Sequence, residues 1–225
     1  MRQCLRLGKR VVIKVGTTVV CNANGRIALS RLGGVVQEIK GLQQTGKQII
    51  LVSGGVVAVG RQSIGLPQKI NHVDRHACAA AGQDTILSTY HLLFRLTGVQ
   101  CAQVLITQQD FLDQQRYTSL TQTINRLLDL GVVPIINEND VTLQPRKDHR
   151  AFGDNDMLGA LVASGTDADS LLLLTDHSVV CSKAAVLAAE AGVHAVVSSE
   201  CDVANIRRVF DAEEVGTFFP AQPKK

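Results

Sequence analysis

Val132-Val133-Pro134-Ile135-Ile136-Asn137-Glu138-Asn139-Asp140 is the stretch that decides the fold class of this chain. Its apolar half is short and rich in β-branched residues, which predicts a buried strand, and its polar half stands where that strand would end. A second polar cluster, Gly153-Asp154-Asn155-Asp156, precedes an apolar run from Met157 to Ala163. This order predicts a helix that starts with Asp154 as its N-cap.

The two polar clusters predict one binding crevice. In open α/β sheets, ligands bind at the carboxyl ends of the strands. Acid and amide side chains at that edge suit a small polar ligand that carries a charged amine. The alternative is that the Asn and Asp residues only form turns and cap the helix, as these residue types often do. We favour a binding site because two clusters of the same kind follow each other along the chain.

Strand and helix patterns alternate along the rest of the chain, which predicts an α/β protein. The expected strands cover residues 10–16, 48–52, 100–107, 132–136, 168–175, 193–197 and 215–219. The expected helices cover residues 28–44, 56–62, 74–96, 118–130, 155–164 and 182–191. Such alternation predicts a three-layer αβα sandwich with a mostly parallel central sheet, because crossover helices cover both of its faces.

The composition narrows the class of protein. The formal net charge of +3 is too small to indicate a nucleic-acid partner, and 4% aromatic residues provide few stacking surfaces for single strands. No apolar stretch reaches the length of a membrane span, and the first ten residues lack the apolar core of a signal peptide. The six cysteines are scattered without metal-ligand spacing, so we expect reduced thiols in a cytoplasmic protein.

A phosphate site is expected at the end of the first strand, where Lys14 interrupts the apolar run and Gly16-Thr17-Thr18 follow. A buried lysine is costly unless its amine reaches water or an anion, and a Gly/Thr turn offers backbone and hydroxyl donors. The alternative is an edge strand with an outward lysine. Ser53-Gly54-Gly55 also follows a strand, and the free N–H groups that open the next helix can hold an anion.

Two other patterns are weaker. Gly41, Gly46 and Lys47 match most of the GxxxxGK motif, but the match precedes a strand, whereas a P-loop follows one, so we expect Gly46 to end a helix. His72 and His76 lie four residues apart, but no third ligand accompanies them, so a solvated helix face is favoured over a metal site.

With these residues in view, the chain resembles the amino acid kinase family, and within it the glutamate 5-kinases and the kinase half of the bifunctional pyrroline-5-carboxylate synthases. The matching motifs run nearly from end to end of the chain. They are IKVGTT (Ile13–Thr18), SGG with AVGR (Ser53–Arg61), AAAGQ (Ala79–Gln83), VPIINEND (Val133–Asp140), FGDND (Phe152–Asp156), LLLLTD (Leu171–Asp176) and VGTFF (Val215–Phe219).

The resemblance implies ATP-dependent phosphorylation of the γ-carboxylate of L-glutamate, the first step of proline synthesis, with ATP and Mg²⁺ as cofactors. It also implies possible feedback inhibition by proline and a homo-oligomer, either a dimer or a tetramer. The alternatives are a related kinase with a different carboxylate substrate, or a non-catalytic domain that binds glutamate or proline. One domain spanning residues 1–225 is expected, with a glutamate-binding lobe at about 1–165 and a nucleotide-binding lobe at about 166–220.

The resemblance also implies roles for individual residues. The implied catalytic residues are Lys14, Asp156 and Lys183. The implied glutamate-binding residues are Ser53, Asp140 and Asn155, with Asp140 on the substrate ammonium. The implied ATP-binding residues are Lys14, Gly16, Thr17, Thr175, Asp176 and Lys183, and no metal ligand is implied from the protein alone.

The sequence departs from the family after Asp176. The family carries several tens of residues there, including a nucleotide-lid hairpin, whereas here Asp176 leads almost directly to Lys183. Either the segment is truly deleted, which would leave a glutamate site with poor ATP binding, or a loop is missing from the chain as written. The second explanation, which we favour, predicts a Cα–Cα spacing far above the ~3.8 Å of a trans peptide between Asp176 and Val186.

Overall fold

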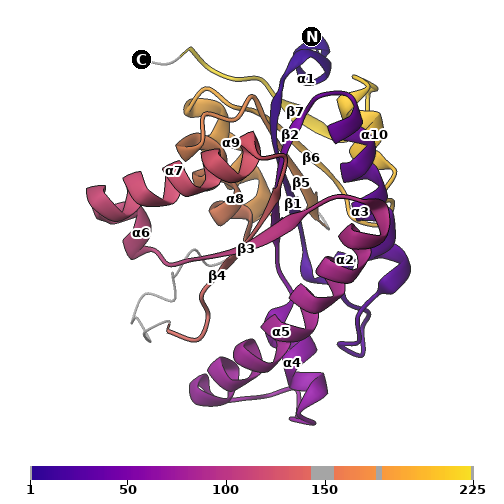
Figure 1. Cartoon of the computed structure of the whole chain (residues 1–225), viewed down its shortest axis with the longest axis vertical. Coiled ribbons are helices and arrows are strands. Elements are labelled where there is room, and N and C mark those ends of the chain that lie inside the picture. The colour runs from indigo at the N-terminus through magenta and orange to yellow at the C-terminus, as the bar shows by residue number, and fades with distance from the viewer. Residues whose placement is uncertain (1, 143–154, 176–178, 224–225) are drawn as a thin grey trace.

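A computed structural model of the chain describes residues 2–142, 155–175 and 179–223. Its described strands form one seven-stranded sheet in the order β3-β4-β2-β1-β5-β6-β7 (Figure 1). The strands are β1 (Arg10–Val15), β2 (Gln48–Ser53), β3 (Cys101–Ile106), β4 (Val133–Glu138), β5 (Ser170–Thr175), β6 (His194–Ser199) and β7 (Thr217–Phe219). All neighbours are parallel except β6 and β7.

Helices cover both faces of the sheet, so the predicted αβα sandwich is confirmed (Figure 1). One face packs against α1 (Gln3–Leu7), α2 (Thr17–Val20), α3 (Leu29–Gln44), α4 (Val56–Ser63), α5 (His72–Thr97) and α10 (Asn205–Phe210). The other face packs against α6 (Gln109–Leu112), α7 (Gln114–Asp129), α8 (Asn155–Gly165) and α9 (Val179–Glu190). Each face has its own apolar core.

The alternation of side chains along each strand sorts the polar residues at the carboxyl edge by face. In β1, Val11 and Ile13 join the core under α5, while Val12 joins the core under α8. By the same alternation, Lys14 points to the α8 face, as does Thr175 of β5. Ser53, which ends β2, points to the α5 face. The carboxyl edge therefore carries two sets of polar side chains, one on each face.

The position of β1 decides between the two expectations for Lys14. Strand β1 lies between β2 and β5, and Lys14 is 2% exposed. The edge-strand alternative is therefore wrong, because this lysine lies in a central strand and its amine must find a partner inside the protein.

A close approach at two glycines fixes how α5 packs against α4. A Cβ at Gly82 of α5 would lie 1.8 Å from the carbonyl oxygen of Val56, and one at Gly60 of α4 would lie 1.8 Å from that of Cys78. Neither helix can carry a side chain at this crossing. The small residues Ala77-Cys78-Ala79-Ala80-Ala81-Gly82 thus allow α5 to pack closely on α4. The two helices lie together at the bottom of Figure 1.

The expected elements all occur among the described residues, with boundaries shifted by a few positions. The sequence did not predict α1, α2, α6 and α10, which are short helices without an apolar period long enough to detect. The expected N-cap Asp154 lies outside the described residues. Lys47 donates to the carbonyl oxygens of Leu5 and Arg6 at the end of α1, so it has a structural partner and no phosphate role is needed.

Three findings concern wider properties of the described part of the chain. None of its helices has the length and apolar character needed to cross a bilayer. Its cysteines are free: Cys4, Cys21, Cys78, Cys101 and Cys201. No group of three or more His, Cys, Asp or Glu residues in the described ranges is placed to hold a metal ion.

Candidate functional site

A buried ion pair marks the α8 side of the carboxyl edge. The Lys14 Nζ atom lies 2.5 Å from Oδ1 of Asp156, and the two side chains are 3% and 0% exposed. Lys14 comes from the end of β1 and Asp156 from the first turn of α8. Both residues are among the catalytic residues that the family resemblance implies. An amine held this way presents its positive charge at a fixed point of the strand edge.

The Gly16 turn lies beside the same amine. A Cβ at Gly16 would lie 3.5 Å from Lys14 Nζ and 3.2 Å from Oε2 of Glu200, which follows β6. Gly16 is the N-cap residue of α2, and Thr17 is the first residue of that helix. Because Gly16 has no side chain, the small space between a lysine amine and a carboxylate stays open at this turn. No sequence signal pointed to Glu200, because its proximity to β1 depends on the strand order.

The remaining residues predicted for the nucleotide are only partly described. Thr175 is buried at the end of β5, and Asp176 lies outside the described residues. Lys183 is exposed on α9, and no ion pair or hydrogen bond to another described residue involves it. From Val179 to Val186 the backbone is a continuous helix, so no break lies in that part. Residues 176–178 lie outside the described residues, so the prediction of a break between Asp176 and Val186 stays a prediction.

On the α5 side, Ser53 forms a buried hydroxyl pair. Its Oγ atom lies 3.0 Å from the hydroxyl oxygen of Tyr90 in α5, and both residues are at most 2% exposed. Burial raises the pKa of the Tyr90 phenol, and the bond from Ser53 opposes that rise. Tyr90 therefore keeps its proton and fixes the position of the Ser53 side chain.

A chain of amides joins three elements next to Ser53. The Asn155 Nδ2 atom donates to Oδ1 of Asn137 at 3.3 Å, and Asn137 Nδ2 donates to Oε1 of Gln83 at 3.0 Å. A Cβ at Gly54 would lie 2.7 Å from Asn155 Nδ2. The chain thus runs from α8 through β4 to α5 and spans both faces of the sheet edge.

Asp140, which follows β4, contacts the first turns of α5. Its Oδ1 atom is 3.8 Å from Nη2 of Arg75, and its side chain is 13% exposed. Burial raises the pKa of Asp140, while the charges of Arg75 and His76 lower it. A half-exposed arginine and a mostly buried carboxylate therefore face each other at the mouth of the site.

One face of helix α5 lines the candidate site on the side of the sheet that α5 covers. His76, Gln83 and Tyr90 recur every seven residues, which brings them onto one helical face. Gln83 bonds to Asn137, Tyr90 bonds to Ser53, and His76 lies near Asp140. Sequence analysis gave these three residues no role in binding, although their heptad spacing within a helix was a usable signal.

The structure thus places most of the predicted residues along one edge of the sheet. Four strand or helix ends contribute them: Lys14, Gly16 and Thr17; Ser53; Asp140; Asn155 and Asp156. Comparison with known proteins shows the family of the chain: a family model described as "Amino acid kinase family" matches residues 9–194.

The chain belongs to the amino acid kinase family. It is 32% identical to the glutamate 5-kinase of Myxococcus xanthus (strain DK1622) over 97% of this chain and 68% of that protein. It is 36% identical to the Δ1-pyrroline-5-carboxylate synthase of Mesembryanthemum crystallinum over 94% of this chain. It is 40% identical to the glutamate 5-kinase of Azoarcus sp. (strain BH72) over 79% of this chain.

Length separates this chain from its relatives. It spans 37% of the Mesembryanthemum synthase and 47% of the Azoarcus kinase. The alignment with the Myxococcus kinase runs over 261 positions, although this chain has only 225 residues. The Myxococcus kinase therefore contains residues that this family member lacks.

The fold is also shared with a solved structure. The carbamate kinase of Giardia superposes with a TM-score of 0.66, covering 96% of this chain and 99% of that one, at 17% sequence identity. At this identity, the likeness establishes the fold of this family member and leaves the substrate to be argued from the site.

Proposed function

We propose that this chain transfers the γ-phosphoryl group of ATP to the γ-carboxylate of L-glutamate, giving L-glutamyl 5-phosphate, the first step of proline biosynthesis. The observation that carries the proposal is the buried Lys14–Asp156 pair, which adjoins the amide chain of Asn155 and Asn137. Relatives named glutamate 5-kinase and pyrroline-5-carboxylate synthase support the choice of substrate.

The chemistry needs no general base. The substrate carboxylate is ionised at neutral pH, so one of its oxygens attacks the γ-phosphorus directly. A new P–O bond forms as the bond from the γ-phosphorus to the β,γ-bridging oxygen breaks, and ADP leaves with that electron pair. Lys14 neutralises charge on the transferring group, and Asp156 holds the amine in place.

The nucleotide phosphates are proposed to lie at Gly16 and Thr17, with Thr175, Asp176 and Lys183 as further ATP-binding residues. Mg²⁺ fits this edge because Glu200 offers a carboxylate beside the Gly16 turn, and this ion takes most of its other ligands from phosphates and water. When bound, Mg²⁺ neutralises the phosphate oxygens. The carboxylate of Glu200 alone would repel the nucleotide phosphates, and a bound Mg²⁺ would offset this repulsion.

The amino acid is proposed to lie on the α5 side of the edge. Asp140 binds its ammonium group, and the Ser53 hydroxyl and the Asn155 amide bind its polar oxygens. These side chains come from elements on both faces of the sheet. Hydrogen bonds link Asn155 to Asn137 and Asn137 to Gln83 across the edge. The γ-carboxylate then extends toward Lys14.

The test is a coupled ADP-release assay with ATP, Mg²⁺ and one acceptor at a time: L-glutamate, L-aspartate, N-acetyl-L-glutamate or carbamate. Acyl phosphate formed in the assay is trapped with hydroxylamine as a hydroxamate. We expect ADP release and hydroxamate with L-glutamate alone. Turnover with another acceptor and none with glutamate would assign the chain to a different substrate in the same family.

A second candidate function is a non-catalytic domain that binds glutamate or proline. The observation that favours it is the short connection between β5, which ends at Thr175, and α9, which starts at Val179, together with the exposure of Lys183. Calorimetric binding of glutamate without binding of ATP would support this candidate. Proline inhibition, a homo-oligomer and the division into two lobes stay predictions of the family resemblance.

A further inference from the structure

We infer that Arg75 and His76 bind the α-carboxylate of the amino acid substrate, and that with Asp140 they make the site selective for α-amino acids. This inference deepens the proposed function and depends on it. Arg75 and His76 lie in the first turns of α5, and neither was assigned a role in binding by the sequence.

The first argument is the spacing of the charges. Arg75 Nη2 lies 3.8 Å from Asp140 Oδ1, which is longer than a hydrogen bond. In an α-amino acid, the amino nitrogen and the carboxyl carbon are about 2.5 Å apart. A ligand whose ammonium contacts Asp140 therefore brings its α-carboxylate within reach of the Arg75 guanidinium. The carboxylate of Asp140 and the guanidinium of Arg75 thus complement the ammonium and the carboxylate of a zwitterionic amino acid.

The second argument is the difference in burial. The Asp140 side chain is 13% exposed, whereas that of Arg75 is 55% exposed. A guanidinium that is half exposed keeps donors for a ligand and can form a bidentate contact with a carboxylate. Burial restricts the Asp140 side chain, whereas the more exposed Arg75 side chain has room to adjust to a ligand.

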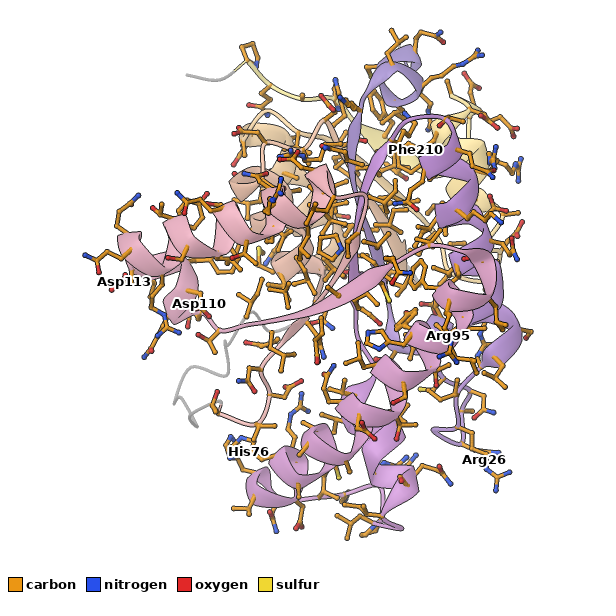
Figure 2. The ribbon with its side chains drawn as sticks, viewed as in Figure 1. Arg26, His76, Arg95, Asp110, Asp113 and Phe210 are labelled. Carbon is orange, nitrogen blue, oxygen red and sulfur yellow. The ribbon has the colours of Figure 1, made fainter. Side chains whose placement is uncertain are left out.

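His76 supplies an independent observation. Its Nε2 atom is buried, and it has no hydrogen-bond partner among the residues that the structure describes. A buried ring nitrogen without a partner costs free energy unless a ligand atom satisfies it. His76 lies at the end of α5 next to the segment that follows β4, as Figure 2 shows, and its charge acts on Asp140. A carboxylate oxygen there would accept from this nitrogen.

Substrate analogues separate the two halves of this recognition. Glutarate is glutamate without its ammonium group, and 4-aminobutyrate is glutamate without its α-carboxylate; both retain the carboxylate that is proposed to accept the phosphoryl group. The Arg75 interaction is thus missing from 4-aminobutyrate, and the Asp140 interaction is missing from glutarate.

The experiment is titration calorimetry of the full chain with each of the three ligands, for the wild type and for Arg75→Gln, His76→Ala and Arg95→Gln. Arg95 is an exposed arginine at the opposite end of α5 and serves as the matched control (Figure 2). We expect Arg75→Gln to weaken glutamate binding about tenfold or more and to leave 4-aminobutyrate binding unchanged. His76→Ala should do the same to a smaller extent, and Arg95→Gln should change neither.

The outcomes are distinguishable. An equal loss for glutamate and 4-aminobutyrate in Arg75→Gln would show that Arg75 acts only by adjusting the charge of Asp140, and would overturn the inference while leaving the proposed function intact. Wild-type binding of 4-aminobutyrate as tight as that of glutamate would overturn it as well. Failure of the wild type to bind glutamate at all would overturn both the inference and the proposed function.

Discussion

The Lys14 Nζ atom lies 2.5 Å from Oδ1 of Asp156, and this pair ties the central strand to the first turn of α8. Both charges are buried, so each depends on the other. Removing one partner of such a pair costs about 3–5 kcal/mol, because the remaining charge stays buried without compensation. The pair is therefore important for stability as well as for the proposed transfer step.

Asp156→Asn should lower kcat for glutamate phosphorylation by about a hundredfold or more, with little change in the KM for glutamate, because Asp156 places the lysine amine. Steady-state kinetics measure both constants, and thermal unfolding reports the loss of stability. Asp129→Asn, an exposed aspartate at the end of α7, is the matched control. An effect confined to KM would place Asp156 in the amino acid site instead.

Asp140→Asn should raise the KM for glutamate strongly and leave ATP binding unchanged. It should also stabilise the empty protein at neutral pH. Burial raises the pKa of the Asp140 carboxyl group in the folded state, so the folded state binds a proton more tightly than the unfolded state. The free energy of unfolding therefore falls as the pH rises from the unfolded-state pKa through the folded-state pKa of this group.

The measurement for Asp140 is the melting temperature of the wild type and of Asp140→Asn from pH 3 to pH 8 without ligand. The melting temperature of Asp140→Asn should exceed that of the wild type by more as the pH rises. Equal weakening of glutamate and ATP binding, or a stability difference independent of pH, would contradict the assignment of this carboxylate.

Tyr90→Phe should raise the KM for glutamate a few-fold, because the Ser53 hydroxyl loses the partner that holds it. A double-mutant cycle with Ser53→Ala should give a coupling of about 1 kcal/mol in unfolding, the usual value for one buried hydrogen bond. Additive effects of the two substitutions would mean that the bond contributes neither to stability nor to binding.

Glu200→Gln should make nucleotide binding less dependent on Mg²⁺. The carboxylate beside the Gly16 turn repels phosphate unless a cation lies between them. We expect tighter ATP binding by the variant in the presence of EDTA and weaker binding in the presence of Mg²⁺. Titration of a fluorescent ATP analogue under both conditions measures this, and an unchanged ratio of the two affinities would remove Glu200 from the nucleotide site.

Gly82→Ala should destabilise the protein by several kcal/mol or prevent folding, because the added Cβ would lie 1.8 Å from the Val56 carbonyl oxygen. Gly33→Ala in α3 is the control, since no atom lies within 4 Å of its added Cβ. That variant should gain about 0.5–1 kcal/mol from the better helix propensity of alanine. Urea unfolding of both variants measures the difference.

The sequence by itself determined the fold class and predicted a site at the carboxyl edge of the sheet. The apolar runs alternate between strand and helix periods over most of the chain, which indicates a mostly parallel sheet. Polar residues that follow buried parallel strands then lie at the carboxyl edge of that sheet. The local pattern singled out Lys14, because a lysine in a buried strand needs water or an anion for its amine, whereas the role of Asp156 came from the family resemblance. The family motifs supplied the individual roles, which the experiments above test.

Only the tertiary structure decided which residues meet across that edge. The stripe of His76, Gln83 and Tyr90 contacts the site because α4 and α5 cross at two glycines, and this crossing depends on packing between segments far apart in the chain. Glu200 approaches Gly16 because β5 alone separates β6 from β1 in the sheet. Strand order and helix crossing depend on long-range contacts, which the local period of a sequence does not encode.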